Sequence, residues 1–175
     1  MGIEQKEPQI SLRDRIVKVA LQNIGAPASN YRGPEKGLSP TDGFDCSGFV
    51  KFVLTEAGIT IPDYITLSGD MKPIRHTNEF FDHFGVYVQW MKEEAGDLVF
   101  FSNGLYPGHM GIMIDRYRYI HSPGKNKQKV NVRFLLKSPI DNYDPMAIYR
   151  INPIGFKRPA LSIVREDGRW IQELI

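Results

Sequence analysis

The sequence predicts an α+β fold in which N-terminal helices pack on a central antiparallel β-sheet. Apolar side chains recur every three or four positions over residues 12–24 and again over 46–57, which is the spacing of an amphipathic helix. Short segments rich in β-branched and aromatic residues follow from residue 86 onward. Because the helices precede the strands rather than alternate with them, an antiparallel sheet is favoured over a parallel one.

Capping and turn residues set the limits of the predicted elements. Ser11 is the N-cap of the first helix, and the Gly-Ala-Pro turn at 25–27 ends it. Asp45 is the N-cap of the second helix and Gly58 its C-cap. A short third helix is expected over 77–82. The expected strands are 86–88, 97–101, 109–114, 118–121, 130–134 and 146–151.

Length and cysteine content indicate one compact domain. A chain of 175 residues buries roughly two thirds of its unfolded surface without needing disulfides. Its single cysteine cannot form an intrachain disulfide in any case. We expect the domain over residues 1–151 and a C-terminal extension over 152–175, in which the turn Glu166-Asp167-Gly168 predicts a β-hairpin.

Charge and hydropathy exclude several classes of function. The 22 basic and 20 acidic residues leave a net charge of +2, which gives no basis for nucleic-acid binding. No apolar stretch approaches the roughly 20 residues that span a bilayer, and no apolar run of signal-peptide length opens the chain. We expect a protein that is cytoplasmic, or exported by a phage or secretion-system route without the usual signal peptide. Basic residues cluster at 116–118 and 125–129, where they could attract an anionic substrate, although a solvated turn is the simpler explanation.

Cys46 is the candidate nucleophile because it falls where the second helix is predicted to start. Backbone N–H groups at a helix start have no partner in the helix, and the macrodipole adds positive charge there. We therefore expect the thiol pKa to lie below its usual value of about 8.5. We also expect the Cys46 N–H to stabilise an oxyanion. The alternative is a lone cysteine that packs as a small apolar residue.

Two of the four histidines can be placed side by side. His109 opens one predicted strand and His121 closes the next, with a turn around residue 115. Symmetric pairing about this turn sets the two histidines opposite each other, with their Cβ atoms about 5 Å apart on one face. We assign Cys46 as nucleophile, His109 as the general base that takes the thiol proton, and His121 as the group that orients the base.

Six sequence blocks, in the same order, resemble the NlpC-type cell-wall cysteine peptidases. The resemblance extends over about residues 12–151 and implies a papain-like fold, with Cys46, His109 and His121 as a catalytic triad. The blocks are Tyr31-Arg32-Gly33, Asp45-Cys46-Ser47-Gly48-Phe49-Val50, Arg75-His76-Thr77, Gly96-Asp97-Leu98-Val99-Phe100-Phe101, His109-Met110-Gly111-Ile112 and Tyr119-Ile120-His121.

The same resemblance implies a reaction and a substrate. The expected activity is hydrolysis of peptidoglycan stem peptides or muropeptides at the γ-D-glutamyl–diamino acid bond, with no cofactor and no metal. Tyr31, Asp45, Ser47 and Arg75 are the implied substrate-binding residues. Asp45 and Ser47 could equally serve as helix-capping residues.

Three other hypotheses stay open at the level of sequence. An acyltransferase or amidase would use the same Cys-His-His site, because an acyl-thioenzyme can be resolved by nucleophiles other than water. A zinc site could be formed by Cys46, His109 and His121, all of which are zinc-ligand types. A wall-binding domain without turnover would retain the fold alone.

Overall fold

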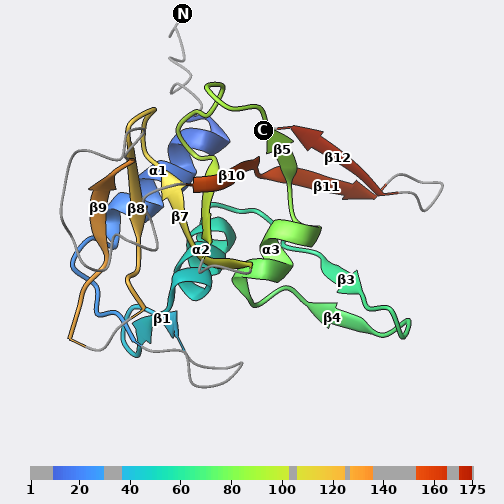
Figure 1. Cartoon of the computed structure of the whole chain (residues 1–175), viewed down its shortest axis with the longest axis horizontal. Helices are drawn as coiled ribbons and strands as arrows, with labels where there is room; N and C mark the ends of the chain where they lie inside the picture. The colour runs from blue at the N-terminus through green and yellow to red at the C-terminus, as the bar shows by residue number, and fades with distance from the viewer. Residues whose placement is uncertain are drawn as a thin grey trace, which may run out of the picture.

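The computed structural model confirms the α+β architecture (Figure 1). It describes residues 10–29, 37–102, 106–124, 127–135, 153–164 and 170–174. A six-stranded central sheet has the strand order β5-β10-β6-β7-β8-β9, and every neighbouring pair is antiparallel. Its strands are β5 Val86–Val88, β6 Leu98–Ser102, β7 Pro107–Met113, β8 Arg118–His121, β9 Asn131–Phe134 and β10 Pro153–Arg158.

Three helices pack on one face of this sheet and share a single apolar core with it. They are α1 Leu12–Gln22, α2 Cys46–Glu56 and α3 Thr77–His83. The helix α2 lies at the centre of the molecule (Figure 1). Its apolar stripe predicted from sequence is fully buried at Phe49, Val50, Val53 and Leu54. The helical spacing therefore identified the buried face of α2 correctly.

Strand β6 separates two apolar cores. Its Leu98 and Phe100 join the helix-facing core, whereas Val99 and Phe101 join a second cluster on the opposite face. This alternation is the period-two pattern of a strand buried on both sides. The sheet is therefore held by packing on both faces where it carries the candidate site.

A cap and a close backbone contact fix the start of α2. Asp45 is the N-cap, and its Oδ1 accepts a hydrogen bond of 2.7 Å from the Gly48 N–H. A Cβ at position 48 would lie 1.8 Å from the carbonyl oxygen of Gly37, so this position requires glycine. The same Gly37 oxygen accepts a bond of 3.1 Å from the Asp45 N–H. The first turn of α2, which carries Cys46, therefore has a defined position.

Two short hairpins flank the helices. They are β1 Leu38–Ser39 with β2 Gly43–Phe44, and β3 Asp63–Ile65 with β4 Met71–Pro73. The β3–β4 hairpin projects beyond α3 (Figure 1). Its base is held where the Tyr64 hydroxyl donates a 2.9 Å hydrogen bond to Glu79 and the Tyr64 ring stacks on His83 at 4.4 Å.

The β7–β8 register differs from the predicted register by two residues. Ile112 pairs with Ile120, which sets His121 opposite Gly111 and not opposite His109. The predicted direct pairing of the two histidines is therefore wrong. Because side chains alternate with a period of two, a shift of two residues still leaves both histidines on the same face.

The turn between β7 and β8 explains this shift. The Asp115 Oδ1 atom accepts 2.8 Å hydrogen bonds from the N–H groups of both Tyr117 and Arg118. These bonds extend the turn past residue 115 and centre it on residue 116. Each residue of β8 consequently pairs with a β7 residue two positions later than the symmetric prediction gave.

The C-terminal region corrects the domain boundary expected at residue 151. Strand β10 lies between β5 and β6, so residues 153–158 belong to the central sheet and not to an extension. Arg158 donates hydrogen bonds of 2.9 and 3.1 Å to the fully buried carboxylate of Asp97. Strands β11 Ala160–Val164 and β12 Trp170–Leu174 then form a projecting hairpin (Figure 1). The strand predicted over 146–151 lies outside the described residues.

Candidate active site

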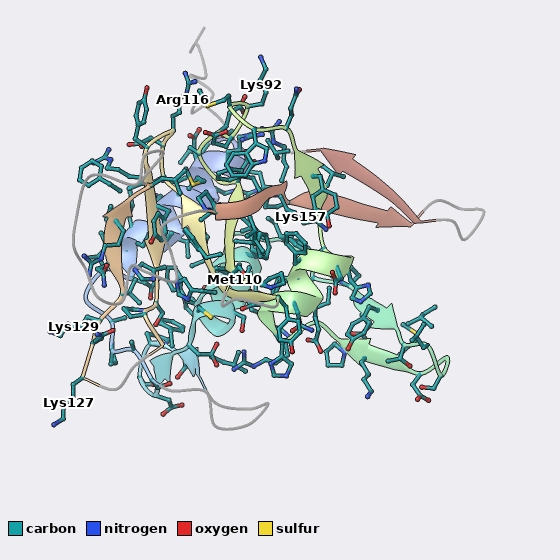
Figure 2. All side chains as sticks on the ribbon, in the orientation of Figure 1. Lys92, Met110, Arg116, Lys127, Lys129 and Lys157 are labelled. Atoms are coloured by element: carbon teal, nitrogen blue, oxygen red, sulfur yellow. The ribbon has the colours of Figure 1, made fainter. Side chains whose placement is uncertain are left out.

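Cys46 lies where α2, α3 and β7 meet. It is the first residue of α2, and its Sγ is 3.5 Å from the Oγ1 of Thr77, the first residue of α3. The backbone N–H groups of Met110 and Ser47 also donate hydrogen bonds to the sulfur. Met110 is buried at the centre of the molecule (Figure 2). The sulfur is therefore held at a junction of three elements that are far apart in sequence.

The contact between Cys46 and β7 follows from the place where β8 ends. The backbone bonds of an antiparallel strand alternate between its two neighbours. The Ile114 N–H donates to the Arg118 carbonyl at 2.9 Å, so the N–H of Met110, four residues earlier, also faces the β8 side. Strand β8 ends at His121, and beyond that end the Met110 N–H interacts with the sulfur of Cys46. The thiol thus lies at the edge of β7, one residue from His109.

Burial raises the pKa of the Cys46 thiol above its usual value, which corrects the expectation of a lowered pKa. The residue is partly exposed, but the sulfur lies in the packed junction, where a thiolate loses its hydration. The Asp45 carboxylate raises the pKa further, whereas the Thr77 hydroxyl and the two backbone N–H groups oppose the rise. The thiol therefore needs a neighbouring base to become a nucleophile at neutral pH.

The two predicted catalytic histidines are in hydrogen-bond contact. The Nε2 of His109 lies 2.8 Å from the Nδ1 of His121, with His121 fully buried and His109 9% exposed. The rings of Phe101 and Tyr119 pack beside them. Because Nε2 of His109 faces His121, Nδ1 is the nitrogen of His109 that can accept a proton from a thiol. In the tautomer that this requires, His109 Nε2–H donates to His121 Nδ1.

Gly111 permits the approach of the two histidines. A Cβ at position 111 would lie 2.8 Å from the Ile120 carbonyl oxygen and 3.2 Å from the His121 Cβ. Without that Cβ, β8 comes close enough for His121 to reach His109 diagonally across the two strands.

Three of the predicted substrate-binding residues bind one another beside the sulfur. Arg75 forms a salt bridge with Asp45 and donates hydrogen bonds to Asp45 Oδ1 at 3.1 Å and to Ser47 Oγ at 2.9 Å. The three residues are 4 to 5% exposed. This network joins the segment before α3 to the first turn of α2, the two elements that meet at Cys46. Tyr31, the fourth predicted residue, lies outside the described residues.

Thr77 is a site residue to which sequence analysis gave no role. The signal that could have found it is the start of a helix. Glu79 accepts 2.7 Å hydrogen bonds from the N–H groups of both Arg75 and His76, which caps α3 at this point. The cap places the Thr77 hydroxyl against the thiol.

Within the described residues, no group of three or more histidine, cysteine, aspartate or glutamate side chains is arranged to hold a metal ion. The geometry therefore gives no support to a zinc site at Cys46, His109 and His121. None of the helices in the described part of the chain combines the length and the apolar character needed to cross a membrane.

A cysteine at a helix start, held against an antiparallel sheet beside a histidine pair, places this protein in the class of papain-like α+β folds. Within that class the chain belongs to the NlpC/P60 family. The sequence model of the NlpC/P60 family matches residues 31–144 of 175, which is well over half of the chain. The resemblance drawn from the six sequence blocks is thereby confirmed.

Individual relatives agree with this assignment. The gamma-DL-glutamyl hydrolase of Bacillus subtilis is 30% identical over 128 residues, which cover 67% of this chain and 27% of the relative. The bifunctional muramidase/DL-endopeptidase CwlT of Bacillus subtilis is 33% identical over 115 residues, covering 62% and 29%. An NlpC/P60 family protein from Bacillus cereus aligns in structure with a TM-score of 0.62 at 25% identity, over 86% of this chain and 41% of its own. The chain spans between 23 and 34% of the length of the curated relatives it matches.

Proposed function

We propose that this protein is a cysteine peptidase that hydrolyses peptidoglycan stem peptides at the γ-D-glutamyl–diamino acid bond. The observation that carries the proposal is the contact of Cys46, at the start of α2, with β7, the strand of His109, whose ring is hydrogen-bonded to His121 of β8. Family membership supports it, since two relatives bear the names gamma-DL-glutamyl hydrolase and DL-endopeptidase.

In the proposed first step, the thiol proton moves from Cys46 Sγ to Nδ1 of His109. The raised thiol pKa makes this transfer necessary, because a protonated thiol is a poor nucleophile. His121 accepts the hydrogen bond from His109 Nε2–H and so fixes the orientation of the imidazolium that forms. The thiolate then attacks the carbonyl carbon of the scissile amide.

The remaining steps use the start of α2 and the same imidazole. The oxyanion of the tetrahedral intermediate is stabilised by the Cys46 N–H at the helix start. The His109 imidazolium gives its proton to the leaving amine, and the C–N bond breaks to leave an acyl-thioenzyme. Water, deprotonated by His109, attacks the thioester and releases the carboxylate product and the free thiol.

Asp45 is the residue proposed to bind the amino end of the substrate. Asp45 supplies a carboxylate beside the sulfur, where it could bind a substrate ammonium group. That carboxylate is already paired with Arg75 and hydrogen-bonded to Ser47, so a bound ammonium would share it with them. Tyr31 is included on the family resemblance.

The test compares wild-type protein with Cys46→Ala on purified muropeptides of known structure. Wild-type protein should release fragments that end in a new D-glutamyl γ-carboxylate, identified by mass spectrometry. Cys46→Ala should reduce the rate by at least about 10⁴-fold, as removal of a catalytic nucleophile does elsewhere. Thermal unfolding of the variant should stay close to that of the wild type.

His83→Ala is the matched control, because His83 is an exposed histidine of α3 that stacks on Tyr64 away from the sulfur. Its rate should equal that of the wild type. An active Cys46→Ala variant would contradict the mechanism. Transfer of the acyl group to an added amine, with no hydrolysis product, would favour the acyltransferase instead.

A further inference from the structure

The segment that follows His121 carries charges of one sign only. Residues 121–140 contain five basic residues and no acidic residue, so the rest of the chain has a net charge of −3. Three of these basic residues are described. Lys127 and Lys129 are exposed in the connection between β8 and β9, and Arg133 lies on β9. This positive segment begins at a residue of the candidate active site.

Backbone pairing places these two lysines near the cysteine. The Ala28 N–H donates a 2.8 Å hydrogen bond to the Gln128 carbonyl, and Pro27 forms a bridge with Lys129. On the other side of that segment, Ala28 forms a bridge with Phe44, two residues before Cys46. One extended segment therefore separates the two lysines from the chain that enters α2.

The β8–β9 register also places Lys129 near the candidate active site, because β8 carries His121. Asn131 pairs with His121 in the β8–β9 ladder. Lys129 is two residues further along, which is about 7 Å of extended chain beyond the end of β8. That end of β8 is also where the sulfur of Cys46 meets β7.

The charges of Lys127 and Lys129 are available to a ligand. In the described part of the chain, neither ammonium group has a salt-bridge partner, whereas Arg118 at the far end of β8 is paired with Asp115 at 2.6 Å. Figure 2 shows Lys127 and Lys129 projecting from one edge of the molecule. Arg116 and another exposed cation, Lys92, lie at the opposite end (Figure 2).

We propose that Lys127 and Lys129 form a specificity edge that binds the free carboxylates of an acidic γ-glutamyl peptide while its scissile bond lies at Cys46. The inference rests on the proposed function and specifies its substrate class. A glutamyl residue linked through its γ-carboxyl keeps its α-carboxylate, so such a peptide carries negative charge beside the bond to be cut. Lysine ammonium groups near a site attract such a charge over several ångströms, and the attraction weakens as salt is added.

The experiment compares two charge-reversal variants that change the net charge equally. Lys127→Glu/Lys129→Glu reverses the proposed edge, and Lys92→Glu/Arg116→Glu reverses two exposed cations at the other end. We would measure kcat/KM on a γ-glutamyl stem peptide and on the same peptide with its α-carboxylate amidated, at about 20 mM and about 500 mM salt.

The edge variant should lose about tenfold in kcat/KM on the carboxylate peptide at low salt, chiefly through KM. The loss should shrink at high salt and on the amidated peptide, and the control variant should match the wild type. Equal values for the two variants in an active wild-type background would overturn the inference. No cleavage of either peptide by the wild type would instead overturn the proposed function.

If the wild type cleaves neither peptide, a binding measurement still tests the inference. In the Cys46→Ala background, the carboxylate peptide should bind more weakly when Lys127→Glu/Lys129→Glu is added, and binding should not change with Lys92→Glu/Arg116→Glu. Tighter binding of a DNA oligonucleotide of matched charge than of the peptide would show that the edge serves a nucleic acid and would overturn the assignment.

Discussion

Two buried cations lie at opposite ends of α3, and the protein accommodates them in different ways. Arg75 precedes the helix and is 5% exposed. Lys157 of β10 packs near its other end (Figure 2) and is 2% exposed. Arg75 is paired with the carboxylate of Asp45. The Nζ of Lys157 lies 4.4 Å from the ring centre of Tyr87 and 6.0 Å from that of Phe81. Among the described residues, no salt bridge reaches Lys157.

The comparison shows that the buried charge of Arg75 acts on the candidate active site, whereas the buried charge of Lys157 does not. Arg75 forms an ion pair with the Asp45 carboxylate, which lies next to Cys46. It is this carboxylate that raises the thiol pKa. The Arg75 guanidinium can bond two acceptors at once, which suits a position where geometry must be fixed. Aromatic faces attract Lys157 more weakly and fix no second charge. Burial accordingly lowers the pKa of Lys157, and the nearby Asp82 carboxylate only partly opposes this.

The largest effect is expected from Arg75→Met, which breaks the paired arrangement. The variant leaves the Asp45 carboxylate buried without its counter-charge. Removal of one partner of a buried ion pair costs about 3 to 5 kcal/mol, so the free energy of unfolding should fall by about that amount. Urea unfolding of the wild type and the variant measures the difference.

The double variant Arg75→Met/Asp45→Asn provides the control. Asparagine retains an oxygen that can accept the hydrogen bond from the Gly48 N–H, and neither position 45 nor position 75 then carries a buried charge. Most of the lost stability should therefore return. If Arg75→Met alone costs less than about 1 kcal/mol, the pair behaves like an exposed salt bridge and the comparison with Lys157 fails.

The sequence was sufficient for the parts of the site that depend on periodicity. The helical spacing that starts at Cys46 predicted which face of α2 is buried. The alternation of strands placed His109 and His121 on one face even though their register was predicted two residues out of place. Both patterns depend on local geometry, which a short segment determines by itself.

Contacts between distant segments could not be predicted in this way. Arg75 and Asp45 are 30 residues apart, and no local rule indicates that their charges meet below the surface. Burial of the sulfur, which reversed the expected direction of its pKa shift, arises from the packing of α3 and β7. Strand β10 was missed because its Pro153, Gly155 and Lys157 interrupt the apolar alternation that marks a strand.

A second, smaller effect is expected from Thr77→Val. This variant tests whether the first residue of α3 lowers the pKa of the Cys46 thiol. The Thr77 hydroxyl lowers the thiol pKa, so its removal should move that pKa further above the usual value. The rate of alkylation by iodoacetamide should then reach half its maximum at a higher pH than in the wild type. Thr77→Ser retains a hydroxyl and should keep the wild-type profile. An unchanged profile in Thr77→Val would show that the 3.5 Å contact does not affect ionisation.

The smallest effect is expected from Lys157→Met, which tests the aromatic arrangement. At pH 7 the free energy of unfolding should change by less than about 1 kcal/mol, because loss of the cation–π attraction offsets relief from burying the charge. Folding lowers the pKa of Lys157, so the folded protein releases this proton before the unfolded chain does. Between the lowered pKa and about 10.4, the unfolded state therefore holds more protons, and stability should rise with pH in the wild type relative to the variant.

Tyr87→Leu in both backgrounds completes a double-mutant cycle for this end of α3. If Lys157 is held by the ring, Tyr87→Leu should destabilise the wild type more than it destabilises Lys157→Met, with a coupling energy of about 0.5 to 2 kcal/mol. A coupling near zero would mean that the ring merely covers the lysine stem. The two ends of α3 would then differ only in whether a carboxylate is present, and the aromatic faces would have no share in retaining the charge.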